Sequence, residues 1–292
     1  MSTIMPDQTI PARRRHRRVG EDHVITATIP LTDPLTLAWI AWCRNEGIPV
    51  ATATSRTRTL RSIGNAGTAT REDVEAWWLT RTHLAPASRA LDLTNLRSFY
   101  RWCKRWELRD DNPTLRIDSP HVVPGLPRPI TNVDLHKALD ALPPDYRRAV
   151  CLGAYAGLRV AEAAALDWSN VDLEARQIRV IRGNGGKSRR VPMSAVLLTA
   201  LLPNTGGNVV AAGGQPYTAD RLARCIRRAF GRLGIEATFH QLRHRFGTIA
   251  YKATGDVLAV SRLMGHSNIN TTAIYACAND ETAALIAEAV SA

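Results

Sequence analysis

The chain has 292 residues, which is long enough to bury two hydrophobic cores, and we therefore expect two domains. Its formal net charge of +12 predicts an anionic partner, which is most often nucleic acid. No run approaches the roughly 18 apolar residues of a membrane-spanning helix, and no apolar signal opens the sequence. We therefore expect the protein in the cytoplasm. The five cysteines are odd in number and form no C-x-x-C pair, which argues against a disulfide framework and against a zinc site.

Residues 1–30 contain the basic run RRRHRR at positions 13–18 and show no sustained periodicity, which is typical of a flexible basic arm. Such an arm either lies along phosphates or is merely solvated, and the sequence favours neither.

Residues 31–110 are predicted to form a small helical domain, because apolar residues recur at helical spacing behind clear start signals. The expected helices run from Pro34 to Gly47, over 52–63, from Thr70 and from Pro86. In the fourth helix one face is apolar, whereas Arg97, Arg101 and Lys104 gather on another. This basic face could sit in a DNA groove, or it could be an ordinary solvated face, which is the commoner case for a charged helix taken alone. Only the rest of the chain tips the balance towards DNA binding by these three residues.

Residues 111–128 are predicted to be a linker, because they are dense in prolines and glycines that break helices and strands. The second domain is expected over 129–292, with two strands forming a β-hairpin around a glycine-rich turn. Its helices are expected at 131–142, 144–155, 160–166, 194–202, 218–233, 241–253, 256–264, 270–276 and 279–290, and its strands at 177–182 and 189–193. The predicted fold is mainly α with one small β-hairpin: a helical domain followed by an α+β domain.

Three separated segments of this second domain carry reactive side chains. They read GLRVAE at 157–162, HQLRH at 240–244, and Gly265-His266 followed nine residues later by Tyr275. In order and spacing they resemble the signature boxes of the tyrosine recombinase, or phage integrase, family. The resemblance is strong over 129–292 and weaker over 31–110, which resembles the family's helical, SAM-like core-binding domain. With no folded arm-binding domain in view, simple two-domain integrases and Xer-like recombinases are the nearest comparison.

The resemblance implies a role for each of these residues. Tyr275 would attack a DNA phosphate and form a 3′-phosphotyrosine, and Arg159 and Arg243 would clamp the phosphate oxygens. His240 and His266 would donate hydrogen bonds to the phosphate or help to remove the tyrosine proton, without a decision between them. Glu162 lies three residues after Arg159 and could orient its guanidinium group, or form only an exposed ion pair.

The general acid is where the sequence departs from the family. In many members the hairpin reads Gly-Lys-Gly-x-Lys, and its first lysine protonates the leaving oxygen, but Asn184 stands there in this chain. An asparagine cannot supply that proton. We nominate Lys187, the one lysine of the hairpin, with Arg182 or water as the alternative. His240 and His244 have the i, i+4 spacing of a metal-binding helix, but Gln241 replaces the glutamate of that motif, so no metal and no cofactor is expected.

Two further helices have expected roles. Arg221, Arg224 and Arg228 share one face of the helix at 218–233 and are expected to contact DNA, while Leu222, Ile226, Phe230 and Leu233 form its buried stripe. The helix at 279–290 docks either on a neighbouring subunit, as in the family, or on its own domain, and both readings stay open.

The resemblance implies a site-specific recombinase that acts as a homo-tetramer on two double-stranded DNA sites through a Holliday junction, in the nucleoid of a bacterial host. Integration of a phage or mobile-element genome, with an accessory directionality factor, is the first expectation, and resolution of chromosome dimers is the second. A type IB topoisomerase and a non-catalytic DNA-binding regulator are the remaining alternatives.

Overall fold

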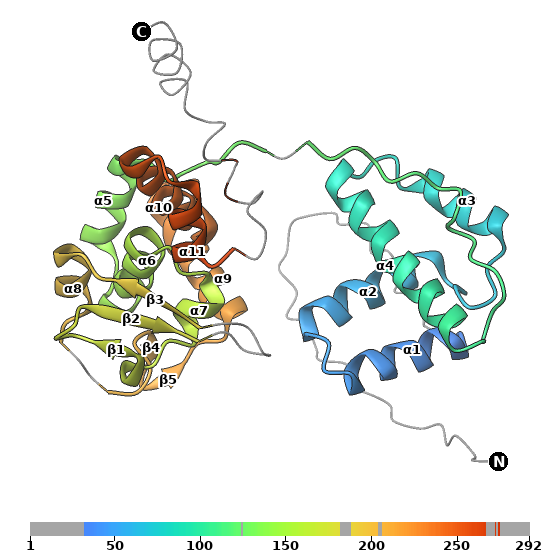
Figure 1. Cartoon of the computed structure of the whole chain (residues 1–292), viewed down its shortest axis with the longest axis horizontal. Coiled ribbons are helices and arrows are strands. Elements are labelled where there is room, and N and C mark those ends of the chain that lie inside the picture. Colours follow the sequence, from blue (N-terminus) through green and yellow to red (C-terminus); the bar gives the residue numbers. More distant parts are fainter. Residues whose placement is uncertain are drawn as a thin grey trace, which may run out of the picture. The chain divides into compact units, whose positions relative to one another are not determined.

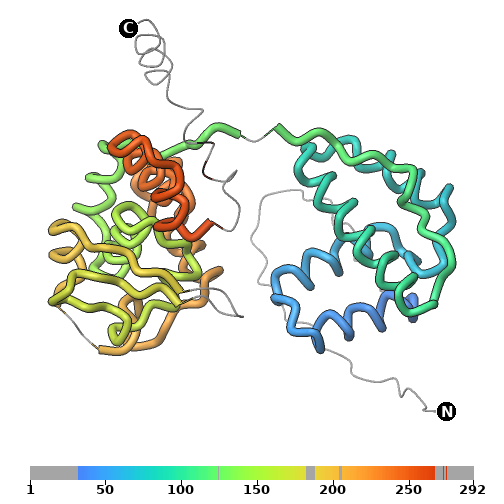
Figure 2. The backbone as a smooth tube through the Cα atoms, viewed as in Figure 1, coloured from blue at the N-terminus to red at the C-terminus, as the bar shows by residue number. Residues whose placement is uncertain are grey.

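The computed structural model describes residues 32–123, 125–181, 188–203 and 206–266, together with Thr272 and Ile274. The chain divides into two compact units, Met1–Val123 and Pro124–Ala292 (Figures 1 and 2). Within the described residues, no helix combines the length and apolar character needed to cross a membrane.

The first unit consists of helices around one aromatic core. They are α1 (Pro34–Asn45), α2 (Val50–Ile63), α3 (Arg71–Thr80) and α4 (Pro86–Arg105). The side chains of Trp39, Leu60 and Phe99 are fully buried between them. Asp33 begins α1 by accepting a 3.0 Å hydrogen bond from the Thr36 N–H, and the same carboxylate accepts the Gly67 N–H at 2.8 Å. The start signals in the sequence therefore mark real helix ends.

The packed part of the first unit runs beyond residue 110, where the sequence placed the start of the linker. Ile117 is buried in the core of this unit, and Thr114 is buried as well. Arg97 donates one hydrogen bond to the Ile117 carbonyl and another, of 2.9 Å, to the Ser119 hydroxyl. Prolines and glycines prevent helix and strand here, but they do not prevent an irregular segment from packing.

The second unit places helices around a small antiparallel sheet (Figure 1). The elements are α5 (Asn132–Ala141), α6 (Pro144–Ala156), α7 (Val160–Ala164), a 3-10 turn (Trp168–Asn170), β1 (Val171–Asp172), β2 (Gln177–Val180), β3 (Arg189–Pro192), α8 (Ala195–Leu201), β4 (Ala211–Ala212), β5 (Gln215–Pro216), α9 (Ala219–Arg232), α10 (Phe239–Thr254) and α11 (Val257–Met264). The sheet has the order β1-β2-β3, and β4 pairs with β5 separately. This mainly helical fold with small antiparallel sheets is the predicted fold class.

Several boundaries differ from the prediction. The two-residue strands β1, β4 and β5 were not predicted, because two residues show no alternation. Helix α7 ends at Ala164 rather than at 166. Helix α10 begins at Phe239 rather than at 241, which places His240 inside its first turn. The hairpin turn at 182–187 lies outside the described residues, as do the predicted helices at 270–276, apart from Thr272 and Ile274, and at 279–290.

The core of the second unit is built around α6. Val150 and Leu152 are fully buried in it, together with Ile178 of β2. Helix α10 packs closely on α6, since a Cβ atom at Gly153 would lie 3.0 Å from the Leu242 Cβ. This contact brings the carboxyl end of α6 to the amino-terminal turns of α10, where two of the sequence boxes meet.

Candidate active site

A glycine turn connects α6 to α7 and presents Arg159. Gly157 caps the end of α6 in the left-handed conformation, with φ +64°, and Arg159 then caps the start of α7. A Cβ atom at Gly157 would lie 2.5 Å from Cδ1 of Phe246 on α10. Both the backbone angle and the available space therefore require glycine.

The Gly157→Ala variant is expected to lower the free energy of unfolding by about 2–4 kcal/mol, because left-handed strain adds to overpacking against Phe246. Urea unfolding of the full chain measures this. The matched control is Gly231→Ala in α9, where the added methyl group meets nothing within 4 Å and should be tolerated. Equal unfolding midpoints for the two variants would contradict the expectation.

Arg243 is the most deeply buried charged side chain of this site, with 2% of its surface exposed. From α10 its guanidinium group donates to the carbonyl oxygen of Gly157 and, at 2.7 Å, to that of Met264. It also lies 3.8 Å from a carboxylate oxygen of Glu162. Arg243 thereby joins the ends of α6 and α11 to α10.

Arg159 approaches the same place from α7 and stays partly open to solvent. Its guanidinium group donates to the Gly265 carbonyl at 3.1 Å and to Glu162 Oε1 at 3.2 Å. About 40% of its side chain is exposed. A guanidinium group that is held in place and still partly exposed is suited to bind a phosphate.

Glu162 is the carboxylate at the centre of the cluster. It accepts the backbone N–H of Arg159 at 2.8 Å and two hydrogen bonds of 2.8 Å from Arg189 on β3. Burial alone would raise the pKa of Glu162, but the hydrogen bonds from Arg189 and the Arg159 N–H, with the charges of both arginines, lower it to about 2. Glu162 is therefore ionised at any physiological pH.

This pKa predicts how stability depends on pH. The folded value, about 2, lies below the ordinary 4.5, so the carboxylate stabilises the fold above pH 4.5 and this contribution is lost as the pH falls towards 2. The full contribution is on the order of 3 kcal/mol. Urea unfolding of the wild type and of Glu162→Gln between pH 5 and pH 3 should show a difference that shrinks with acid. A pH-independent difference would contradict this assignment.

Sequence reasoning missed Arg189. Its side chain is 10% exposed, and besides Glu162 it reaches the Leu263 carbonyl, to which its Nε donates at 2.6 Å. A usable signal was present, because strand alternation puts position 189 on the same face as the buried Val191, and an arginine on an inward face requires an acidic partner.

Two histidines lie one turn apart on α10. The rings of His240 and His244 meet edge to face, with centroids 4.3 Å apart. The pKa of His240 is lowered by desolvation and by the charges of Arg243 and Arg159. Desolvation, His240 and Arg243 lower the pKa of His244 to about 4. Both imidazoles are therefore mainly neutral at neutral pH.

His266 follows Gly265, the left-handed cap of α11. Its Nδ1 lies 2.6 Å from the hydroxyl oxygen of the buried Thr272, and its backbone N–H donates to the Ser261 carbonyl. A hydrogen bond thus orients the His266 ring. His266 directly follows Met264 and Gly265, whose carbonyls accept hydrogen bonds from Arg243 and Arg159.

The structure therefore gathers most of the predicted site. Arg159 and Arg243 both lie within 4 Å of Glu162, His240 lies one turn from Arg243, and His266 follows the carbonyls that the two arginines bind. With Arg189, three guanidinium groups surround one carboxylate, which leaves a net positive charge suited to an anion. Lys187, Asn184 and Tyr275 lie outside the described residues.

The residues expected to bind DNA occupy surfaces of both units. On α9, Arg224 and Arg228 are exposed and Arg221 lies over the Tyr217 ring, while Leu222, Ile226 and Phe230 are fully buried. On α4, Lys104 is exposed, Arg101 donates to the Arg97 carbonyl, and Arg97 itself holds residues 117 and 119. Arg97 is thus partly committed to its own unit.

Comparisons with known proteins agree in pointing to one family. Residues 131–282 match the phage integrase family. Among curated proteins, the tyrosine recombinase XerD of Xanthomonas axonopodis pv. citri is 34% identical over 68% of this chain and 74% of its own length. The tyrosine recombinase XerC of Shewanella amazonensis is 31% identical over 68% of this chain and 72% of its own length.

Solved structures share the fold. The integrase of transposon Tn1549, in complex with transposon right end DNA, superposes with a TM-score of 0.69 at 20% identity and covers 88% of this chain and 99% of its own. A lambda integrase dimer bound to a COC′ core site gives a TM-score of 0.68 at 17% identity and covers 82% of this chain and 93% of its own.

Proposed function

This chain belongs to the phage integrase family of tyrosine-type site-specific recombinases, and we propose that Tyr275 is its nucleophile in a reaction that cleaves and rejoins DNA. The observation that supports this most directly is the cluster around Glu162. Two arginines, Arg159 and Arg243, bind successive carbonyls at the end of α11, immediately before His266. Such a positive cluster stabilises the charge of a pentavalent phosphate transition state.

The Tyr275 phenol oxygen attacks the scissile phosphorus, the bond to the 5′-oxygen breaks, and the tyrosine becomes a 3′-phosphotyrosine. The phenol proton is taken either by His266 or by His240, whose lowered pKa keeps its imidazole neutral. Lys187 protonates the leaving 5′-oxygen, with Arg182 or water as the alternative donor. The 5′-hydroxyl of another strand then reverses the step and regenerates Tyr275, so no ATP is consumed.

The domain roles follow from this proposal. Residues 129–292 would hold the catalytic site, residues 31–110 would bind the core DNA sequence with Arg97, Arg101 and Lys104, and Arg221, Arg224 and Arg228 would contact the same duplex. Residues 1–30 would serve as a basic arm and 111–128 as the linker. We further propose a homo-tetramer on two sites in the bacterial nucleoid, assisted by a directionality factor.

For the biological task we propose integration of a phage or other mobile element. The relatives named XerC and XerD favour a second candidate, resolution of chromosome dimers, whose strand chemistry is the same. Plasmids that carry paired sites separate the two tasks, since joining of two different sites indicates integration and excision between identical sites indicates resolution. Relaxation of supercoils without recombinant product would instead indicate a topoisomerase.

Mapping the attached residue tests the proposed chemistry. Duplexes that bind the full chain are selected from a random-sequence library, nicked near the centre so that the cleaved fragment escapes, and incubated with protein. After denaturation and proteolysis, mass spectrometry is expected to find the nucleotide on Tyr275. An adduct on another residue, or DNA binding with no adduct on any selected duplex, would refute Tyr275 as the nucleophile.

A further inference from the structure

We propose that Arg189 is a positioning residue that neutralises Glu162, so that the charges of Arg159 and Arg243 remain available to the scissile phosphate. The inference rests on the proposed function and concerns a residue outside the sequence boxes. It is argued from the geometry around Glu162, whose carboxylate lies within 4 Å of three guanidinium groups. The distances differ: 2.8 Å for Arg189, 3.2 Å for Arg159 and 3.8 Å for Arg243.

Arg189 is fully committed to the protein. Its Nη1 and Nη2 donate in parallel to the two oxygens of Glu162, each at 2.8 Å, and its Nε donates to the Leu263 carbonyl at 2.6 Å. All three of its nitrogens are therefore engaged, and its side chain is only 10% exposed. A guanidinium group held in this way orients other groups and does not itself bind substrate.

Arg159 and Arg243 contact Glu162 more weakly. The guanidinium group of Arg159 is 3.2 Å from Glu162 Oε1 at Nη1, and that of Arg243 is 3.8 Å from Oε2 at Nη1. Both also bind backbone carbonyls, those of Gly265 and Met264 respectively, which fix direction without cancelling charge. Arg189 thus forms the shortest side-chain ion pair with Glu162, and three guanidinium groups around one carboxylate keep a net positive charge.

Without Arg189 the buried carboxylate would need another cation. Its nearest remaining partners are Arg159 and Arg243, and closer pairing with them would neutralise the groups that face the phosphate. A lysine at 189 would preserve the charge, but it could not make two parallel bonds and also reach the Leu263 carbonyl. The arrangement therefore depends on the shape of arginine as well as on its charge.

Arg189 also fixes the end of α11. Its Nε binds the Leu263 carbonyl, one residue before Met264 and two before Gly265, so three arginines hold three successive carbonyls. Cations stabilise the negative carboxyl end of a helix. His266 follows directly, so the same contacts hold the backbone that leads into it.

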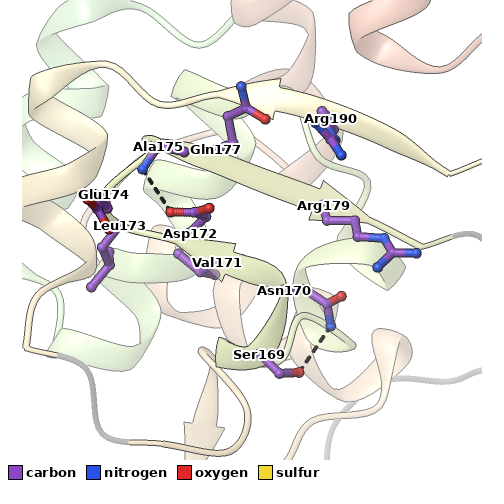
Figure 3. Close-up of a pocket in the computed structure, with 10 residues that line it drawn as sticks. All are labelled: Ser169, Asn170, Val171, Asp172, Leu173, Glu174, Ala175, Gln177, Arg179 and Arg190. Atoms are coloured by element: carbon purple, nitrogen blue, oxygen red, sulfur yellow. Dashed lines mark hydrogen bonds between the residues drawn. The ribbon is translucent and has the colours of Figure 1, made fainter.

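The neighbouring Arg190 provides a matched control. It pairs across the sheet with Arg179, is exposed on the opposite face of β3, and lines a shallow cavity of about 680 Å³ with Arg179 and Asp172 (Figure 3). A substitution there removes the same charge from the same strand without touching Glu162.

The test measures two quantities for each variant: the rate of adduct formation in a single turnover at saturating DNA, and the affinity for DNA. The variants are Arg189→Gln, Arg189→Lys, Glu162→Gln, Arg190→Gln and the double variant Arg189→Gln with Glu162→Gln. Arg189→Gln is expected to slow adduct formation about 100-fold and to change affinity less than about threefold. Arg190→Gln should keep the wild-type rate. The double variant should regain about tenfold over Arg189→Gln, because a neutral amide no longer competes for Arg159 and Arg243.

If Arg189 had a merely structural role, the double variant would form the adduct no faster than Arg189→Gln, and that result would overturn the inference. A wild-type rate of adduct formation for Arg189→Gln would overturn it as well. If Arg189→Gln does not fold, Arg189→Lys decides, with a loss of about tenfold expected and an unchanged rate refuting the proposal. The wild type in the same assay reports on the proposed function separately. An active wild type beside an unaffected Arg189→Gln removes only this inference.

Discussion

Arg243→Lys is expected to slow strand cleavage by about 100- to 1000-fold, although the positive charge is retained. In the structure the guanidinium group binds the Gly157 and Met264 carbonyls at once and still lies 3.8 Å from Glu162. A lysine ammonium is a single point charge and cannot satisfy both carbonyls while it also contacts a phosphate. One buried carbonyl would lose its partner, which lowers the free energy of unfolding by about 1–3 kcal/mol.

Arg245→Lys is the control on the same helix. Its guanidinium group binds Asn132 Oδ1 at 3.1 Å and lies over the Tyr155 ring, at a partly exposed position outside the cluster. Single-turnover cleavage at saturating DNA, with urea unfolding measured in parallel, separates catalysis from stability. If Arg243→Lys cleaves DNA as fast as Arg245→Lys, cleavage does not require a guanidinium group at position 243. The role assigned to Arg243 in binding the phosphate would then be wrong.

Glycine caps determine how this clamp is built. Gly157 ends α6 and Gly265 ends α11, both with φ +64°, and each cap leaves carbonyls that the helix itself does not use. Those carbonyls are the acceptors for Arg159 and Arg243. The glycines of the first and third sequence boxes therefore have a physical purpose beyond flexibility, since they turn two helix ends into binding sites for arginine.

The sequence predicted those parts of the fold that depend on local signals. Pro34, Thr70 and Pro86 mark helix starts because capping and proline preferences act within one turn. The hairpin of β2 and β3 was predicted because alternation and turn residues are also local.

Parts that depend on distant contacts were not predicted. Arg189 meets Glu162 across 27 positions and Leu263 across 74, and no periodicity reports such a pair. The packing of Ile117 into the first unit was hidden for the same reason, because breaker residues around it indicate only the absence of regular structure. The boxes revealed which side chains belong together, but not which backbone carbonyls orient them.

Tyr275→Phe is expected to abolish the covalent adduct completely while DNA affinity stays within about threefold of the wild type, because phenylalanine lacks only the attacking oxygen. His266 and Thr272 precede position 275, and Nδ1 of His266 lies 2.6 Å from the Thr272 hydroxyl oxygen. Nicked duplex, denaturing gels and filter binding give both quantities from one preparation.

Tyr251→Phe is the matched control, since Tyr251 is buried beside Val260, Met264 and Ile274 and loses the same oxygen in the same region. It should form the adduct at the wild-type rate. An adduct that persists in Tyr275→Phe would transfer the nucleophile to another residue, and the positive cluster would then serve a different attacking group. Only the oxygen at position 275 is expected to reach the phosphorus. Loss of the adduct in both variants would therefore mean that the substitutions disturb packing around α11.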